Sequence, residues 1–588
     1  MGNKDSFKKD LLISFGIFAA CFILMYFVLG FFRFGLKTPY TYDGDDVNQW
    51  YMLAKLIKEK GWLVHNDRLG APFGSDIYDF SGFYLMNFEL LIVKLLVMVT
   101  RDIYVTMNVS LLINYSLCCS MAYLVLRQIG TGRAISAIGS FFYGVSPYMF
   151  FRSLMHFSLS VCYFVPLSVL LCIWCATEGE DYLKIGKGFF KNPKNIMTLV
   201  FIVLIPNNGW GYYAIFTCYF LLFSCVIRYF RTRSLRQAAK PLGVIFLIAL
   251  FFMIALIPVF IFEAKNGNNL DVASREPVQS EIYSLQIAEM LIPFNTHGWK
   301  IFSSINGRFN NNMLYINENV SSYLGIAGII GFFLSLITLI CPFKKDDRKT
   351  DILKIMSSFI VFAILLGTFG GFSALVSLYF TLLRSYNRIS IFILFMCIVV
   401  LAIYSERFME YVKDRKSKAS KVLLYAAAAV ILLVSVYDVL PGFTEHYEEF
   451  SRNARELQID REFFGSIEDI LEDGDMVYVM PYHRFPEGGR SNEMNDYLLM
   501  NAYLNTDTVR WSYGGIKGRS SDLWNLSVRS WDLTMRINEV RREGFSGVYI
   551  DRRGYTEGEI ENMIPELTEY LGTDPLVSSD GQRFFFKF

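Results

Sequence analysis

Long apolar runs recur along most of the chain and alternate with polar loops. A helix needs roughly 20 apolar residues to cross a bilayer, and Ile196–Pro206 and Ile355–Leu366 fall furthest below that length. The other runs are Leu11–Phe32, Ile103–Leu126, Ala134–Phe150, Phe157–Ala176, Trp210–Ile227, Leu242–Phe262, Tyr323–Ile340, Ile389–Tyr404 and Val422–Val436. This pattern predicts an α-helical multi-span membrane protein with about 11 transmembrane helices.

The loop after the first apolar run contains two further helical patterns. Apolar residues between Val47 and Ile57 follow the i, i+3, i+4, i+7 spacing of an amphipathic helix, with Lys55, Lys58 and Glu59 on its other side. The stretch Gly82–Val99 is apolar but carries two charged residues. We therefore expect two interfacial helices in this loop, both lying at the membrane surface without crossing it.

Basic residues indicate which side each loop occupies, because cytoplasmic loops are rich in Lys and Arg. With a cytoplasmic N-terminus, every basic cluster falls on the cytoplasmic side: Arg127 and Arg133, then 184–194, 228–240, 344–354 and 407–421. The segments on the outer side are 33–102, 263–322 and everything after Asp438. The sequence thus predicts a multi-pass protein of the plasma (inner) membrane with an extracytoplasmic C-terminal domain.

The tail after the last apolar run is polar and charged. Strand patterns at Met476–Pro481, Val509–Tyr513, Gly547–Asp551 and Arg583–Phe588 alternate with an amphipathic helix at Leu533–Arg542. Such alternation is typical of a small α/β domain. We divide the chain into a transmembrane domain, 1–440, and a soluble extracytoplasmic α/β domain, 441–588.

Composition narrows the class of protein. Of the 588 residues, 53% are hydrophobic and 16% aromatic, which is typical of membrane proteins. A net charge of +2 provides no basic field for nucleic acid. No nucleotide-binding or metalloprotease motif is present, so the sequence supports no cofactor. A divalent metal stays an unsupported alternative.

The turn Tyr42–Val47 contains Asp43, Asp45 and Asp46 close to the membrane surface. Placing carboxylates there costs free energy, so they are expected to bind a ligand or take part in catalysis. Asp46 and Gln49 fit a capping box, but a cap needs only one aspartate. The remaining carboxylates point to acid/base catalysis or metal binding, and we favour Asp45 as a general base.

Several basic and polar residues fall at outer ends of the predicted spans. Arg384 and Arg388 are four residues apart and can form a fork for a phosphate, or else extend to lipid headgroups. Arg152 and His156 share the same spacing at another outer turn. They are candidate substrate contacts, and the alternative is that His156 simply lies at the membrane interface without a functional role. Glu318 lies just before a span and is a candidate substrate contact.

These motifs, in this order, resemble the GT-C superfamily of integral membrane glycosyltransferases, in its bacterial YfhO-like or a related branch. The matching segments are Gly44-Asp45-Asp46, Gly70-Ala71-Pro72-Phe73-Gly74 with Asp79-Phe80, Arg127-Gln128-Ile129-Gly130, Ser146-Pro147-Tyr148 with Arg152 and His156, Asn317-Glu318 before Tyr323-Leu324-Gly325, and Arg384 with Arg388.

The resemblance implies transfer of a hexosyl or pentosyl sugar from a polyprenyl-phosphate donor to a glycan, lipid or protein acceptor outside the cytoplasm, in cell-envelope glycan biosynthesis. On the family pattern the first-loop base is Asp45, with Asp43 and Asp46 as alternatives, and Arg384 and Arg388 hold the donor phosphate. Asp79 and Tyr386 join Arg152, His156 and Glu318 as expected substrate contacts.

Sugar transfer requires a base near the acceptor and positive charge near the departing phosphate. We therefore expect the aspartate turn and the arginine pair to line one cavity that opens away from the cytosol. A transporter or flippase of lipid-linked sugars is the alternative, although ionisable residues gathered at one membrane face favour chemistry there.

Overall fold

The computed structural model describes residues 4–81, 87–207, 211–271, 275–313, 318–341, 347–415, 418–440 and 443–588. Several predicted features therefore lie outside the described residues in part. These are the start of the second interfacial helix (82–86), Asn317 of the motif before Tyr323, and the basic residues Lys344, Lys345 and Lys416.

Each predicted apolar run contains a helix. By length and composition, eight helices in the described part of the chain can cross a membrane, and three shorter apolar helices accompany them. The corresponding elements are α1 (Lys4–Val28), α6 (Ile103–Ile129), α7 (Arg133–Gly144), α10 (Val165–Thr177), α11 (Pro193–Leu204), α12 (Tyr212–Thr232), α14 (Lys240–Ala255), α19 (Gly325–Ile340), α20 (Arg348–Gly367), α22 (Ser390–Arg415) and α23 (Lys418–Asp438). The chain is a multi-pass membrane protein.

Two of these helices form the centre of the bundle. Every residue of α10 from Val165 to Ala176 is buried, as is every residue of α22 from Ile391 to Val400. A helix that is apolar all round is stable only when protein or lipid covers all its faces. Here α12 packs on α10, and α19 and α20 pack on α22, so these two sequences form the core of the bundle.

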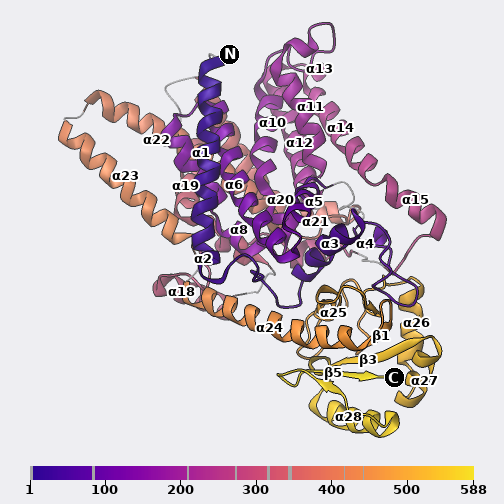
Figure 1. Cartoon of the computed structure of the whole chain (residues 1–588). Coiled ribbons are helices and arrows are strands. Elements are labelled where there is room, and N and C mark those ends of the chain that lie inside the picture. Colours follow the sequence, from indigo (N-terminus) through magenta and orange to yellow (C-terminus); the bar gives the residue numbers. More distant parts are fainter. Residues whose placement is uncertain are drawn as a thin grey trace.

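Short helices connect the spans. Those before α10 are α2 (Phe31–Phe34), α3 (Val47–Lys60), α4 (Tyr78–Ser81), α5 (Phe88–Thr100), α8 (Pro147–Arg152) and α9 (Phe157–Ser160). Those after α12 are α13 (Leu235–Ala238), α15 (Ile257–Asn266), α16 (Gln279–Ile282), α17 (Ile287–Leu291), α18 (Lys300–Asn312) and α21 (Phe372–Ser377). In Figure 1, α3, α4 and α5 lie near the end of the bundle that faces the C-terminal sheet, away from the N-terminus.

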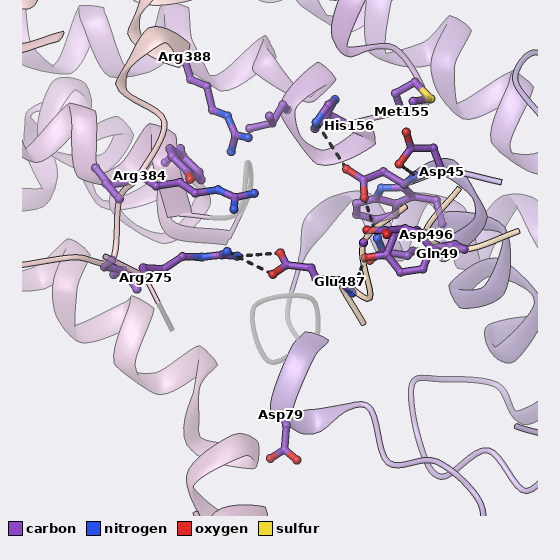
Figure 2. A pocket seen from close by; sticks show the side chains of 18 of the residues that line it. Asp45, Gln49, Asp79, Met155, His156, Arg275, Arg384, Arg388, Glu487 and Asp496 are labelled. Atoms are coloured by element: carbon purple, nitrogen blue, oxygen red, sulfur yellow. Dashed lines mark hydrogen bonds and ion pairs between the residues drawn. The ribbon is translucent and has the colours of Figure 1, made fainter. Parts of the chain in front are cut away.

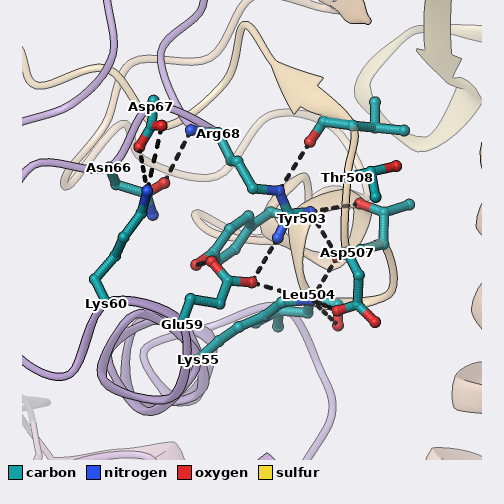
Figure 3. Close-up of polar contacts among 12 residues, drawn as sticks. Lys55, Glu59, Lys60, Asn66, Asp67, Arg68, Tyr503, Leu504, Asp507 and Thr508 are labelled. Carbon is teal, nitrogen blue, oxygen red and sulfur yellow. Dashed lines mark hydrogen bonds and ion pairs between the residues drawn. The ribbon is translucent and has the colours of Figure 1, made fainter. Parts of the chain in front are cut away.

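The helix α3 differs from the prediction in its environment. Every residue from Val47 to Ile57 is buried, including Lys55. The Lys55 ammonium donates to the carbonyls of Leu504 and Thr506 and pairs with Asp507 at 3.2 Å (Figure 3). The tail thus covers the helix face that the polar pattern assigned to solvent, and its carbonyls and carboxylate satisfy the buried charge.

The tail forms a five-stranded mixed sheet flanked by helices, in strand order β2-β1-β3-β5-β4. β1 is parallel to β2 and β3, whereas β5 is antiparallel to β3 and β4. The strands are β1 (Met476–Met480), β2 (Arg510–Trp511), β3 (Phe545–Asp551), β4 (Leu576–Val577) and β5 (Arg583–Lys587). The helices are α24 (Phe443–Ile470), α25 (Met500–Leu504), α26 (Ser520–Arg529), α27 (Leu533–Arg542) and α28 (Glu557–Leu571).

The first outer loop extends this sheet. The Trp511 N–H donates to the Arg68 carbonyl at 2.9 Å, and the Ala71 N–H returns a bond to the Trp511 carbonyl at 3.0 Å. Gly70 has φ +69°, and a Cβ there would come within 2.9 Å of the Gly515 Cα. A side chain would therefore disrupt this contact. The boundary between the two predicted domains remains a prediction, but the contacts across it are extensive.

One buried ion-pair cluster joins the end of the chain to α24. Arg583 is fully buried and pairs with Asp460 at 2.6 Å, with Asp580 at 2.8 Å and with Glu456 at 3.0 Å. Asp460 also accepts a hydrogen bond from the Tyr42 hydroxyl at 2.8 Å. The cluster therefore reaches Tyr42, the first residue of the aspartate turn.

We expect Arg583→Ala to destabilise the protein by about 3–5 kcal/mol, because truncation leaves the buried Asp460 carboxylate uncompensated. Thermal unfolding of the purified protein in detergent measures the effect as a fall in Tm. The matched control is Arg542→Ala, whose side chain is 72% exposed, and its Tm should stay close to the wild-type value. Equal Tm values for the two variants would contradict the importance of this cluster.

Candidate functional site

A cavity of about 570 Å³ lies between the membrane helices and the tail. Six parts of the chain supply its charged and imidazole side chains: the aspartate turn, α4, the turn before α9, the segment around 275, the segment 384–388, and the tail from 487 to 496. The polar lining residues are Asp45, Asp46, Gln49, Asp79, His156, Arg275, Arg384, Arg388, Glu487 and Asp496. The structure therefore brings the aspartate turn and the arginine pair to one cavity, as expected from the sequence.

The aspartate turn is built from its own backbone and side chains. The Asp43 carboxylate accepts the Asp45 N–H at 3.0 Å, and the Asp45 carboxylate accepts the Asp46 N–H at 2.9 Å. Asp45 and Asp46 line the cavity, whereas Asp43 is not among its lining residues. Asp43 thus shapes the turn, whereas Asp45 and Asp46 face the cavity.

The tail holds this turn in place. The Tyr497 N–H donates to the Gly44 carbonyl at 2.8 Å, and the Asn495 amide donates to the Asp43 carbonyl at 2.9 Å. Gly44 has φ +73°, and a Cβ there would come within 2.7 Å of the Leu498 Cα. The close approach of the tail explains why a glycine stands between two aspartates.

The two cavity-lining aspartates differ in their electrostatic surroundings. Burial, reinforced by the charges of Asp45 and Glu487, raises the pKa of Asp46 to about 8. Burial and the charge of Asp496 also raise the pKa of Asp45, but the backbone N–H of Asp46 donates to this carboxylate and opposes the rise. A pKa of about 8 favours the protonated form of Asp46 at neutral pH, so Asp45 is the candidate proton acceptor of the pair.

Two neutral groups surround Asp46. The Gln49 amide donates to the Asp46 carboxyl at 2.9 Å, and the His156 Nε2 lies 3.5 Å from it. Burial, aided by the charge of Arg152, lowers the pKa of His156 to about 3, so the imidazole is neutral. Asp46 precedes α3 without making a side-chain capping bond, so the capping interpretation does not account for its carboxylate.

The arginines lie across the cavity from the aspartates (Figure 2). Arg388 is buried, lies 4.3 Å from the Tyr212 ring centroid, and contacts the Glu318 carboxylate at 3.4 Å. The same carboxylate pairs with Arg152 at 2.7 Å. Although burial opposes its ionisation, Arg152 and Arg388 hold the pKa of Glu318 well below its ordinary range. The ion pair with Glu318 therefore restricts the orientation of the Arg388 guanidinium.

Arg384 and Arg275 complete the cationic side. Arg384 stacks 5.2 Å from the Tyr283 ring centroid and makes no ion pair among the residues that the structure describes. Arg275 pairs with Glu487 of the tail at 2.9 Å (Figure 2). The cavity thus contains one unpaired guanidinium, Arg384, beside one that is partly neutralised, Arg388. This arrangement can receive an anionic group.

Some predicted substrate contacts are engaged elsewhere. Asp79 lines the cavity but forms an ion pair with Arg519 at 2.6 Å and accepts from the Asn269 amide at 2.9 Å. Figure 2 shows it well apart from the other carboxylates. Tyr386 is buried outside the lining, 3.4 Å from the Tyr219 hydroxyl. Their roles in substrate binding stay predictions.

The sequence pattern missed several lining residues. Arg275, Asp496 and Tyr497 have no motif around them, and only the fold brings them to the cavity. The tail was expected to lie outside the membrane, and the fold places its residues Glu487, Gly489, Asp496 and Tyr497 in the wall of the cavity. Among the described residues, no three His, Cys, Asp or Glu side chains are grouped so that they could hold a metal ion.

Solved structures with a similar fold include two glycosyltransferases. ArnT from Cupriavidus metallidurans bound to undecaprenyl phosphate is 8% identical, with a TM-score of 0.50 and 97% coverage of each chain. Arabinofuranosyltransferase AftD from Mycobacteria is 12% identical with a TM-score of 0.48, over 92% of this chain. This chain spans only 35% of the length of AftD.

The likeness to ArnT concerns the fold, and it confirms the GT-C-like fold that the sequence motifs predicted. The protein is thus a multi-pass membrane protein of GT-C-like architecture with an appended mixed sheet. It belongs to the family described as Domain of unknown function (DUF6311), which matches residues 16–387. No curated protein matches the sequence.

Proposed function

We propose that this protein is a glycosyltransferase that moves a sugar from a polyprenyl-phosphate donor to an acceptor outside the cytoplasm. The observation that carries the proposal is the single cavity in which Asp45 faces Arg384 and Arg388. The GT-C-like fold supports this class of enzyme, and the undecaprenyl phosphate bound to ArnT supports the class of carrier.

Asp45 acts as the general base. It removes the proton from an acceptor hydroxyl, whose oxygen attacks the anomeric carbon of the donor sugar while the bond from that carbon to the phosphate oxygen breaks. Positive charge develops on the sugar ring and negative charge on the departing phosphate. Arg384 and Arg388 stabilise that phosphate, and the low dielectric of the cavity strengthens both interactions.

The orientation follows from the distribution of charge. The N-terminus and α13, in the basic stretch 228–240, lie at one end of the bundle, and the tail lies at the other (Figure 1). The positive-inside rule assigns the first end to the cytoplasm. We therefore place the cavity and the tail on the extracytoplasmic face of the plasma (inner) membrane, where glycans, lipids and proteins are available as acceptors.

A panel of polyprenyl-phosphate sugars tests the proposal. Purified protein is incubated with each donor, without and with candidate acceptors, and released polyprenyl phosphate is quantified. We expect at least one hexosyl or pentosyl donor to be consumed, faster when its acceptor is present. Heat-denatured protein is the control. Protein that binds polyprenyl phosphate and moves lipid-linked sugars across vesicles, yet cleaves no donor, would contradict transfer and favour a flippase.

A further inference from the structure

A second, shallower cavity of about 200 Å³ lies at the other end of α3. Lys55 and Lys58 of α3 line it together with Arg101 at the end of α5, Tyr104 at the start of α6, Arg461 of α24, and Leu504, Asn505 and Asp507 of the tail. Asp46, Gln49 and Trp50, at the beginning of the same helix, line the first cavity. Nine residues of helix separate positions 49 and 58, which corresponds to about 14 Å.

The acidic groups of the second cavity already have partners. Asp102 caps α6, where its carboxylate accepts the N–H groups of Tyr104 at 2.9 Å and Val105 at 3.0 Å. Asp507 pairs with Lys55 at 3.2 Å (Figure 3). These two carboxylates are therefore occupied by a helix terminus and by the buried lysine.

Three cations remain. Lys58, Arg101 and Arg461 are exposed, and none of them has a carboxylate partner within the described ranges. They come from three different elements and converge on one hollow. The Arg461 guanidinium stacks 5.7 Å from the Tyr104 ring centroid, which restricts its orientation. Four basic and two acidic side chains line the cavity, which therefore has an excess of positive charge.

Other arginines at the contacts between the tail and the rest of the chain form ion pairs. Arg68 contacts Glu59 at 2.5 Å, and Arg484 contacts Asp522 at 2.5 Å. Basic residues are also disfavoured on the extracytoplasmic side. Solvation alone gives no reason for three unpaired cations to meet in a hollow at this face, whereas an anionic ligand does.

We propose that this second cavity binds a phosphoryl group. Arginine forms paired hydrogen bonds with phosphate oxygens, and lysine adds a point charge. Ile103 lines the cavity and begins the apolar span Ile103–Ile129, so the site lies where a helix leaves the apolar layer. Lipid phosphates occupy this level of a membrane. The site binds the phosphoryl group whether or not the first cavity transfers sugar.

Binding of two probes to the purified full-length protein tests the proposal. The probes are short-chain dihexanoyl phosphatidylglycerol and inorganic phosphate, and all measurements use an Arg384→Gln background so that the first cavity contributes less. We expect Arg101→Gln/Arg461→Gln to weaken binding of at least one probe about tenfold or more. Arg101→Lys/Arg461→Lys should retain part of the affinity, because it keeps the charge but loses the paired hydrogen bonds.

The matched control is Arg541→Gln/Arg542→Gln, which removes the same charge from α27, outside both cavities. It should leave both affinities unchanged, and unfolding temperatures verify that all variants are folded. Loss of lipid binding alone identifies a headgroup site, and loss of phosphate binding identifies a site for a soluble phosphoryl group. Affinities that are equal in the folded Arg101→Gln/Arg461→Gln variant and the control would overturn the proposal.

Discussion

Replacing Asp45 by Asn should abolish measurable sugar transfer while leaving membrane insertion intact, because the amide cannot accept the acceptor proton. Loss of a general base lowers rates by about 10²- to 10⁴-fold. Asn keeps the size of the side chain and its oxygen, which accepts the Asp46 N–H at 2.9 Å in the wild type. Transfer rates with saturating donor and acceptor measure the effect. A fully active Asp45→Asn enzyme would remove the proposed mechanism.

The neighbouring aspartate provides a sharp comparison. Asp46 is protonated at neutral pH, and Asn resembles a protonated carboxyl group, so Asp46→Asn should lose far less activity than Asp45→Asn. The acid limb of the wild-type rate should lie above the ordinary carboxyl range, because burial raises the pKa of Asp45 and the base must ionise before it acts. The opposite ranking of the two variants would assign the base to Asp46.

The pH profile separates the two groups further. As pH rises through about 8, Asp46 loses its proton and adds a second negative charge beside Asp45. We expect the wild-type rate to change in this range, and the change should be missing in Asp46→Asn, which cannot titrate. A change near pH 8 in the wild type that is missing in Asp46→Asn would assign this titration to Asp46.

Replacing Arg384 by Gln should lower kcat/KM for the donor by about 10²- to 10³-fold, the usual effect of removing one group that stabilises developing negative charge. Arg384 makes no ion pair in the described part of the chain, so its removal breaks no direct contact with a protein carboxylate. Arg384→Lys should recover part of the loss, because it restores charge without the planar fork. Binding of sugar-free polyprenyl phosphate should weaken in parallel.

Two further variants control this experiment. Arg490→Gln removes an exposed positive charge one position from the lining residue Gly489 and should leave donor kinetics close to wild type. Arg388→Gln should affect both function and stability, since it takes a partner from the half-buried Glu318. If Arg384→Gln and Arg490→Gln behave alike, Arg384 does not bind the donor phosphate.

The site depends on the tail more than the domain division suggested. Asp496 and Glu487 contribute carboxylates to the cavity, and Tyr497 and Asn495 hold the backbone of the aspartate turn. The tail is therefore part of the wall of the cavity. It also covers α3, which explains why Lys55, a residue on the polar side of an amphipathic pattern, is buried.

The local features of this protein follow from its amino-acid sequence. Every apolar run became a helix, and Leu533–Arg542 has the predicted bounds, because helical periodicity and apolar length are properties of neighbouring residues. The aspartate turn and the arginine pair were also recognisable from neighbouring residues. Charges at a membrane boundary cost free energy, so their presence there indicates a functional role.

Which of these groups lie close together depends on the packing of distant segments. Gly44 and Tyr497 are joined by a backbone hydrogen bond, and Arg519 reaches Asp79 across 440 positions of the chain. No short segment encodes such a contact, since it depends on how the tail packs against the first outer loop. That packing leaves Asp43 out of the cavity lining, brings Asp45 into it, and engages Asp79 in an ion pair.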